Sequence, residues 1–176
     1  MKTVIVSAFP ACGKSYVYEN QYKYGVTCLD SDSSEFSWIK DSQGVNTSER
    51  NPDFPDNYIQ HIKSNIGKVD IIFVSSHDAV IDALEENELA YVKVVPCYEC
   101  KAEWVGRFWL RGNDSNFIKF ISDNWNDFTD VRKDLTKNYM VGRLQLGNKN
   151  YISDYTGSIM THVGNYKENV NETTQH

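Results

Sequence analysis

Residues 8–15 read Ala-Phe-Pro-Ala-Cys-Gly-Lys-Ser, between a short apolar run and a helix-forming stretch. The spacing is that of a phosphate-binding loop, except that alanine stands where the first glycine usually does. Such a loop directs backbone N–H groups and the N-terminus of a helix toward phosphate oxygens. A loop of this kind connects a buried strand to a helix, and the residues on its two sides are suited to form that strand and that helix. The N-terminal part is therefore predicted to fold as strand, loop and helix.

Within this loop, Lys14 is expected to contact the β- and γ-phosphates of a nucleoside triphosphate, and the Ser15 hydroxyl is expected to bind Mg²⁺. Gly13 lets the backbone approach phosphate where a Cβ would obstruct it. The alternative is a chance Gly-Lys-Ser in an ordinary turn, which the flanking strand and helix argue against. We assign to nucleotide binding the residues Ala11, Cys12, Gly13, Lys14, Ser15 and Tyr16.

Apolar runs alternate with helix-forming segments along the rest of the chain. Further strands are predicted at 26–29, 70–75 and 91–95, with a last strand or hairpin at 141–152. Helices are predicted at 14–24, 56–66, 78–87, 99–111 and 116–138. This alternation predicts an α/β fold whose parallel sheet has about five strands and helices on both faces.

The chain has 176 residues, 40% of them hydrophobic, which suffices for one core. One domain is expected over 1–165, with a polar insertion at about 31–55 and a polar, flexible tail at 166–176. No apolar run reaches the roughly 20 residues of a membrane helix, and the N-terminus does not resemble a signal peptide. We therefore expect a cytoplasmic protein without a membrane partner. The net charge of −6 disfavours a long groove for duplex nucleic acid.

The four cysteines are Cys12, Cys28, Cys97 and Cys100. The last two form a single Cys-x-x-Cys, but a zinc site needs about four ligands and there is no second pair. We therefore predict reduced thiols, with a metal or redox role as the alternative.

Asp30 and Asp32 stand at the end of the second predicted strand. In a doubly wound sheet, ligands bind beyond the carboxyl ends of the strands, so both acids are expected to face the phosphate loop. One carboxylate can hold an Mg²⁺-bound water while the other accepts a proton from an attacking hydroxyl. The alternative is a solvated turn, which Asp-Ser sequences favour by themselves.

Residues 8–15 together with Asp30-Ser31-Asp32 resemble the small P-loop kinases, which include shikimate-kinase-like enzymes, gluconate kinases, nucleoside monophosphate kinases and phage polynucleotide kinases. In the shikimate-kinase branch, a matching Asp-x-Asp supplies a magnesium-shell acid, which maps to Asp30, and a substrate-facing acid, which maps to Asp32. The resemblance covers residues 1 to about 125. The chain is most similar to phage-encoded kinases of the deoxynucleotide-kinase-like type, which implies the host cytoplasm. The Gly-Gly-Gly segment and the arginine motif that bind shikimate are missing, so shikimate is not expected as the substrate.

In these kinases, the region that corresponds to about 99–115 is a lid whose arginines hold the transferring phosphoryl group. The resemblance assigns this catalytic role to Arg107 and Arg111, alongside Lys14. Their i, i+4 spacing places both arginines on one face of the predicted helix. The alternative is a solvated basic face paired to Glu99 or Glu103.

Two further residues are candidate contacts to the phosphate acceptor. Arg50 lies in the insertion, where nucleoside monophosphate kinases bind their acceptor, and can pair with an acceptor phosphate while Phe54 or Trp38 stacks on a base. His77 follows the third predicted strand and would point toward the same edge of the sheet. An ordinary loop and a hydrogen bond at a helix start are the respective alternatives.

These features predict an ATP-dependent phosphotransferase that uses Mg²⁺ and acts on a small acceptor, with a (deoxy)nucleoside monophosphate as the first choice. A polynucleotide or modified-DNA kinase and a small-metabolite kinase share the same motifs. A nucleotide-dependent switch without phosphotransfer is the remaining alternative.

Overall fold

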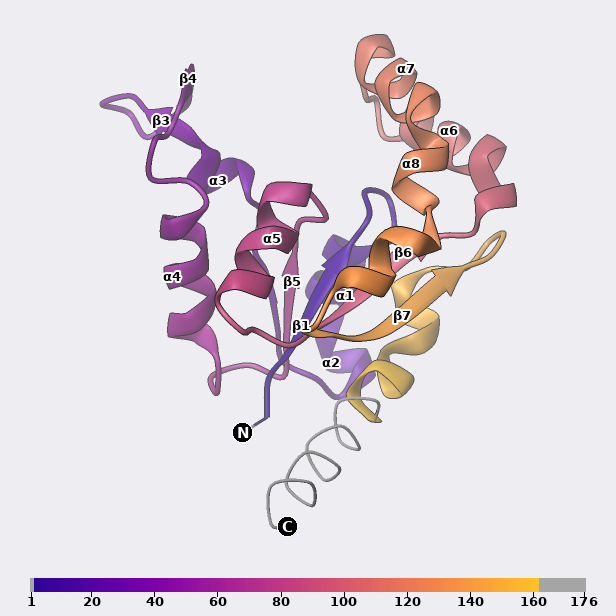
Figure 1. Cartoon of the computed structure of the whole chain (residues 1–176), viewed down its shortest axis with the longest axis horizontal. Coiled ribbons are helices and arrows are strands. Elements are labelled where there is room, and N and C mark those ends of the chain that lie inside the picture. The colour runs from indigo at the N-terminus through magenta and orange to yellow at the C-terminus, as the bar shows by residue number, and fades with distance from the viewer. Residues whose placement is uncertain (1, 162–176) are drawn as a thin grey trace.

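The computed structural model describes residues 2–161. Its central sheet has five strands in the order β2-β5-β1-β6-β7 (Figure 1). The strands are β1 (Val4–Ala8), β2 (Cys28–Asp30), β5 (Ile71–Val74), β6 (Tyr91–Pro96) and β7 (Met140–Leu146). Every pairing between neighbours in this sheet is parallel. The strand bearing the phosphate-binding loop therefore lies in the middle, covered on both faces.

Helices cover the two faces of the sheet with separate apolar clusters. Val4 and Val6 of β1 pack with α1 (Lys14–Glu19), α6 (Lys101–Leu110), α7 (Ser115–Asp123) and α8 (Trp125–Thr129). Ile5 points to the opposite face and packs with α4 (Asp56–Asn65) and α5 (Asp78–Glu86). Successive side chains of this strand point to opposite faces of the sheet, and both faces are covered by helices, which explains why the strand is apolar throughout. The predicted α/β fold with a five-stranded parallel sheet is confirmed.

Two of the predicted helices are broken into shorter ones. The segment 14–24 forms α1 and α2 (Gln21–Tyr24), because the Asn20 amide donates to the Tyr16 carbonyl and ends the first helix. The segment 116–138 forms α7, α8 and the 3₁₀ turn η2 (Val131–Thr136). Asn124 donates to Phe120 O, and the Asp130 carboxylate accepts from the backbone of the next turn. Short polar side chains thus compete with the helical backbone bonds at each break.

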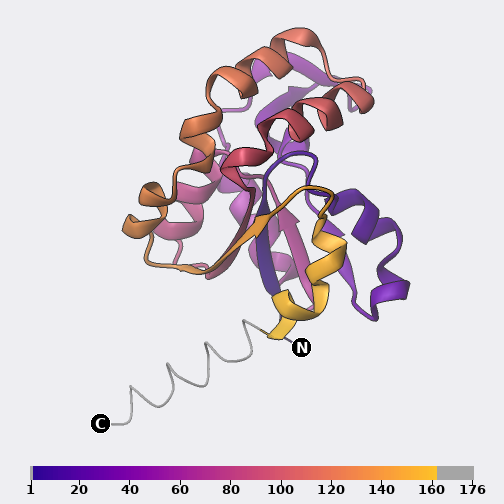
Figure 2. The ribbon, with the colours of Figure 1, turned by 90° about the vertical axis from the view of Figure 1, so that its right-hand side faces the viewer.

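The insertion at 31–55 carries structure that its polar composition does not reveal. It holds α3 (Ser34–Ser37) and an antiparallel pair of strands, β3 (Trp38–Lys40) and β4 (Asn46–Arg50). Figures 1 and 2 show this pair and the α6–α7 segment at the end of the molecule that lies away from the N-terminus. Both therefore stand above the carboxyl ends of the strands.

The prediction for Cys97 and Cys100 is wrong, because the two form a disulfide. After β6, the chain enters the 3₁₀ turn η1 (Tyr98–Cys100), which places the two Cα atoms 5.3 Å apart, within the range that a disulfide spans. Cys12 and Cys28 are free thiols, and both are buried.

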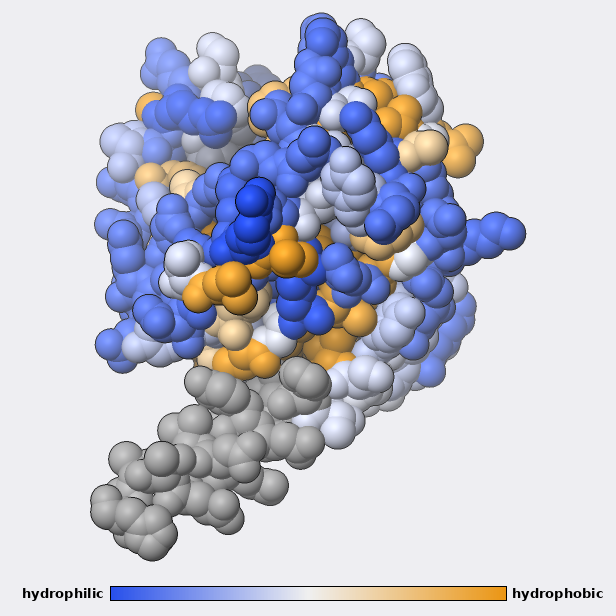
Figure 3. All heavy atoms as spheres, turned by 45° about the vertical axis from the view of Figure 1, so that its right-hand side comes forward, coloured by the Kyte–Doolittle hydropathy of each residue, from blue (hydrophilic) through white to orange (hydrophobic). Residues whose placement is uncertain are grey.

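The surface in Figure 3 is mostly hydrophilic, with apolar residues in separate groups. The exposed large apolar side chains include Trp109, Leu110 and Phe120 of the α6–α7 segment. Within residues 2–161, no helix has the length and hydrophobicity to span a membrane. The predicted tail at 166–176 lies outside the described residues.

Candidate active site

The phosphate-binding loop leaves β1 at Ala8 and enters α1 at Lys14. Two residues have positive φ, Ala11 at 63° and Gly13 at 96°. Lys14 turns back over the loop, and its Nζ donates to the Ala8 carbonyl oxygen at 3.1 Å. This hydrogen bond holds the ammonium group over the loop, inside a cavity of about 1170 Å³.

Burial shapes the chemistry of two groups in this loop. Burial lowers the pKa of Lys14, although the nearby charges of Asp30 and Asp32 favour its charged form. Burial also raises the pKa of Cys12 to about 12, so its thiol stays protonated. Cys12 is fully buried and packs in the apolar core, although it also belongs to the lining of the cavity.

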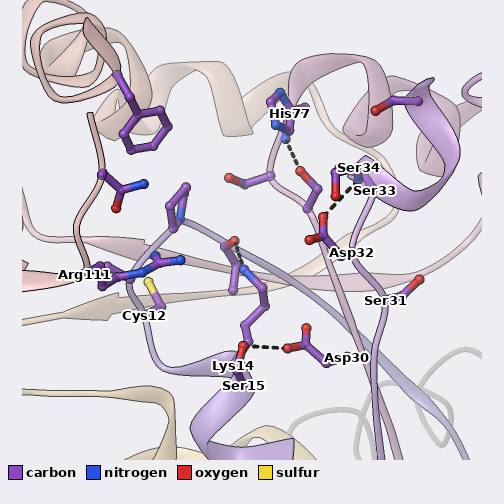
Figure 4. Close-up of a pocket in the computed structure, with 18 of the residues that line it drawn as sticks. Cys12, Lys14, Ser15, Asp30, Ser31, Asp32, Ser33, Ser34, His77 and Arg111 are labelled. Carbon is purple, nitrogen blue, oxygen red and sulfur yellow. Dashed lines mark hydrogen bonds between the residues drawn. The ribbon is translucent and has the colours of Figure 1, made fainter. Parts of the chain in front are cut away.

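The loop and the end of β2 meet through Ser15 and Asp30. The Ser15 hydroxyl donates to Asp30 Oδ2 at 2.7 Å (Figure 4). A hydroxyl and a carboxylate side by side are ligands that suit Mg²⁺, which keeps several waters and phosphate oxygens in its shell. Among the described residues, no group of three or more His, Cys, Asp or Glu side chains is placed to hold a metal. The pair therefore fits an ion that is bound together with a nucleotide.

Asp32 lies on the same strand end, exposed to the cavity. Its Oδ1 accepts a hydrogen bond from the Ser34 backbone N–H at 2.9 Å, as in an Asx turn. The geometry therefore has the solvated-turn character of the alternative, but the other carboxylate oxygen, Oδ2, accepts no hydrogen bond from the residues that the structure describes. Figure 4 shows Asp30 and Asp32 on one side of Lys14, with Arg111 on the other.

Tyr58 of α4 fastens the strand ends that carry these acids. Its buried hydroxyl donates to the Ser31 carbonyl at 2.6 Å and accepts from the Ser75 backbone N–H at 3.4 Å. Ser31 lies between the two acids, and Ser75 follows β5. Tyr58 lies on the buried apolar face of α4 together with Ile59 and Ile62, and the apolar pattern of that face does not reveal the second role of its hydroxyl.

His77 and Arg50 both line the cavity. The Arg50 guanidinium lies over the Trp38 ring at 3.9 Å from its centre, so it covers one face of the indole. Burial lowers the pKa of His77, and the charge of Arg50 acts in the same direction. The histidine is therefore neutral near pH 7 and can accept or donate a hydrogen bond there.

The two arginines of the predicted lid have different surroundings. Arg107 is 6% exposed and makes hydrogen bonds to Glu103, Ala11 O and Asn150 O. It is paired to Glu103 as the alternative stated, but it is buried rather than solvated. Arg111 follows the end of α6, is exposed, and lines the cavity. Within residues 2–161, no carboxylate forms an ion pair with Arg111 or with Arg50.

The structure brings almost all of the sequence-predicted residues to one cavity. Tyr16 is the exception, since its side chain points outward from α1 and is 51% exposed. A residue that the sequence did not single out is Tyr151, which lines the cavity and lies against Gly13. It belongs to a loop far along the chain, so no local pattern indicates it. The cavity lining includes Ala11, Cys12, Gly13, Lys14, Ser15, Asp30, Asp32, Arg50, His77, Arg107 and Arg111.

No protein-family model and no curated protein sequence matches the chain. Among solved structures, a gluconokinase from Sinorhizobium meliloti 1021 is similar, with a TM-score of 0.54 at 13% sequence identity. The match covers 99% of this chain and 98% of that chain. The chain has the fold of the P-loop kinases. At this sequence identity the similarity shows a shared fold only. Any inference about chemistry therefore rests on the side chains of this chain.

Proposed function

We propose that the protein transfers the γ-phosphoryl group of ATP to a small acceptor. The observation that carries this proposal is the meeting of Lys14, Ser15 and Asp30 at the mouth of a phosphate-binding loop, with Asp32 two residues beyond Asp30 at the same strand end. Mg²⁺ bound with the nucleotide would neutralise phosphate charge as the leaving oxygen develops. Lys14 would hold the β- and γ-phosphates, and Ser15 and Asp30 would hold the ion.

Asp32 is the proposed general base for an acceptor hydroxyl. Its free carboxylate oxygen faces the cavity, and it needs only to accept the proton as the acceptor oxygen bonds to phosphorus and ADP leaves. An acceptor phosphate is already ionised at pH 7 and gives up no proton. The role of Asp32 therefore depends on which kind of oxygen attacks.

The acceptor that we propose is a (deoxy)nucleoside monophosphate. Arg50 supports it, because an arginine without a carboxylate partner among the described residues is suited to bind a phosphate bidentately. Phe54 also lines the cavity on this side. The second candidate is a small-metabolite kinase, which the hydroxyls of Ser33, Ser34 and Ser37 in the cavity lining favour. Arg50 would then pair with the carboxylate or phosphate of a compact polar acceptor.

The proposal can be tested by incubating the protein with radiolabelled ATP and one class of acceptor at a time. The classes are a pool of nucleoside monophosphates, a pool of sugars and hydroxy acids, and an oligonucleotide. We expect label to move from ATP to one small acceptor, and to do so only with Mg²⁺. Lys14→Ala is the control for contaminating kinases. Tight ATP binding with slow hydrolysis that no acceptor accelerates would contradict the proposal and indicate a switch. Transfer to the oligonucleotide alone would contradict the proposed acceptor.

A further inference from the structure

Arg107 joins three segments that are distant in the sequence. Its Nη1 donates to the Ala11 carbonyl at 3.2 Å, and its Nη2 donates to the Asn150 carbonyl at 2.9 Å. Its Nε donates to Glu103 at 3.1 Å. The guanidinium also lies over two rings, 3.9 Å from the centre of the Trp104 ring and 4.0 Å from that of the Tyr151 ring. One buried side chain therefore connects α6, the phosphate-binding loop and the loop at 147–151.

The loop that Arg107 contacts has a conformation that its own sequence does not favour. Ala11 has a φ of 63°, which is uncommon for a residue with a Cβ. The carbonyl of this residue is the one that accepts from Arg107. An arginine that donates to it stabilises the peptide orientation that the left-handed conformation produces.

The loop at 147–151 supports the same region from outside. The Tyr151 ring lies so close to Gly13 that a Cβ there would be 3.2 Å from it. Ile152 N donates to the Cys12 carbonyl at 2.9 Å. Glu103 accepts from the Lys149 backbone N–H at 2.8 Å as well as from Arg107. The ion pair thus holds this second loop against the first.

The hydrogen-bonding groups of Arg107 are largely used within the protein. A guanidinium has five N–H donors, and Arg107 makes four hydrogen bonds to protein oxygens. Its charge is balanced by Glu103, and the rings of Trp104 and Tyr151 pack against the guanidinium. A transferring phosphoryl group would have to displace these contacts. Arg111 has no such partners among the described residues.

We propose that Arg107, with Glu103 as its counter-ion, is a positioning residue that holds the phosphate-binding loop in its nucleotide-binding conformation. Arg111 is then the arginine of this segment that meets the transferring group. This division rests on the proposed function in one respect, namely that the loop binds the phosphates of ATP. Arg107 then has no catalytic role of the kind that the sequence analysis assigned to it. Its role is to hold the loop in the conformation that binds ATP.

Cys12 provides a reporter for the conformation of the loop. It is fully buried within the loop, and its thiol is free. Cys28 is also a free and buried thiol, but it lies on β2, outside the loop. Labelling by N-ethylmaleimide without reductant, followed by peptide mass spectrometry, reports both sites in one sample. Local opening of the loop exposes Cys12 alone, whereas global unfolding exposes both.

The test compares Arg107→Ala, Arg107→Lys, Glu103→Gln and the matched control Arg111→Ala. For Arg107→Ala we expect the labelling rate of Cys12 to rise roughly tenfold or more, because hydrogen bonds from a charged group to buried carbonyls are lost, with little change at Cys28. ATP should protect Cys12, and the Kd of ATP should rise while kcat at saturating ATP changes little. Arg107→Lys should restore part of the effect, because an ammonium cannot bridge both carbonyls in the planar geometry of arginine. Arg111→Ala should leave Cys12 labelling unchanged.

Three results would overturn the proposal. One is unchanged Cys12 labelling and ATP affinity in Arg107→Ala or, where that variant does not fold, in Glu103→Gln. Another is a parallel rise at Cys12 and Cys28, which would show general destabilisation. The third is a loss of kcat with intact ATP affinity, which would restore the catalytic role. Should the wild-type protein transfer phosphate to no acceptor, the proposed function fails, whereas labelling and ATP binding still decide the role of Arg107.

Discussion

Replacing Tyr58 by phenylalanine removes a single oxygen atom from the centre of the strand-end region. That oxygen donates to the Ser31 carbonyl at 2.6 Å and accepts from the Ser75 N–H at 3.4 Å. The side chain is 0% exposed, so water does not replace the lost partner. Leaving a buried polar group without its hydrogen bond costs about 1–3 kcal/mol. For a domain of this size, each kcal/mol lowers Tm by about 2–4 °C, which gives a fall of roughly 2–12 °C.

The same change should lower activity beyond its effect on stability. Ser31 stands between Asp30 and Asp32, so its carbonyl sets the path of the backbone that presents both carboxylates. A shift of about 1 Å in catalytic groups can reduce the rate about 100-fold. We expect kcat of Tyr58→Phe to fall by roughly tenfold to 100-fold when it is measured well below the Tm of the variant.

Tyr91→Phe is the matched control for this experiment. The Tyr91 hydroxyl is equally buried and lies near the Glu85 carboxylate, but it makes no well-formed hydrogen bond within residues 2–161. It packs in the same apolar cluster as Tyr58, at the opposite end of the sheet from the cavity. Thermal unfolding and steady-state kinetics of both variants test the reasoning. If Tyr58→Phe is as stable and as active as Tyr91→Phe, its hydroxyl does not position the strand ends.

Three further predictions concern the cavity. Lys14→Ala should abolish detectable ATP binding in calorimetry and leave Tm nearly unchanged, since the ammonium donates a hydrogen bond only to the Ala8 carbonyl among the described residues. Normal turnover would contradict the loop assignment. Asp32→Asn should lower kcat by roughly 10²–10⁴-fold for a hydroxyl acceptor and far less for a phosphate acceptor. Asp30→Asn should instead raise the Mg²⁺ concentration that gives half-maximal activity. Equal small effects of the two substitutions would favour a solvated turn. Arg111→Ala should lower kcat about 100-fold or more with little change in the KM for ATP, and an unchanged kcat would remove it from the site.

The core of the fold was predictable because its signals are local. Continuous apolar runs mark the buried parallel strands, and the loop at 8–15 fixes the strand that lies in the centre. Pairing of β7 with β6 was less certain, since the sequence of that segment also suits a hairpin. The β3–β4 pair was missed because its residues are largely exposed on both faces and show no apolar alternation.

Within the site, the residues adjacent to the strand ends were predictable and the supporting residues were not. Asp30 is the last residue of β2, and Asp32 and His77 come shortly after the ends of β2 and β5, so the topology alone brings them to one edge of the sheet. Tyr151 reaches Gly13 from a loop more than one hundred residues later, and only the folded chain brings them together. The role of the Tyr58 hydroxyl was also not predictable, because Tyr58 lies on an apolar helix face and its pattern indicates packing rather than a hydrogen bond to the strand ends.

Arg107 in α6 and Arg111 just after its end show how burial separates two residues that the sequence pattern treats alike. Both lie on one face of the helix by spacing, next to Trp104 and Phe108, which are fully buried. Arg107 lies in the turn of α6 that packs on the phosphate-binding loop. A buried charge at this position requires a counter-ion, and Glu103, one helical turn earlier, provides it. Position 111 falls past the last turn, before a glycine with a φ of 76°, and has no acid among the described residues. Since the charge of Arg107 is already balanced by Glu103, Arg111 is the one of these two arginines whose charge is available to an anion in the cavity.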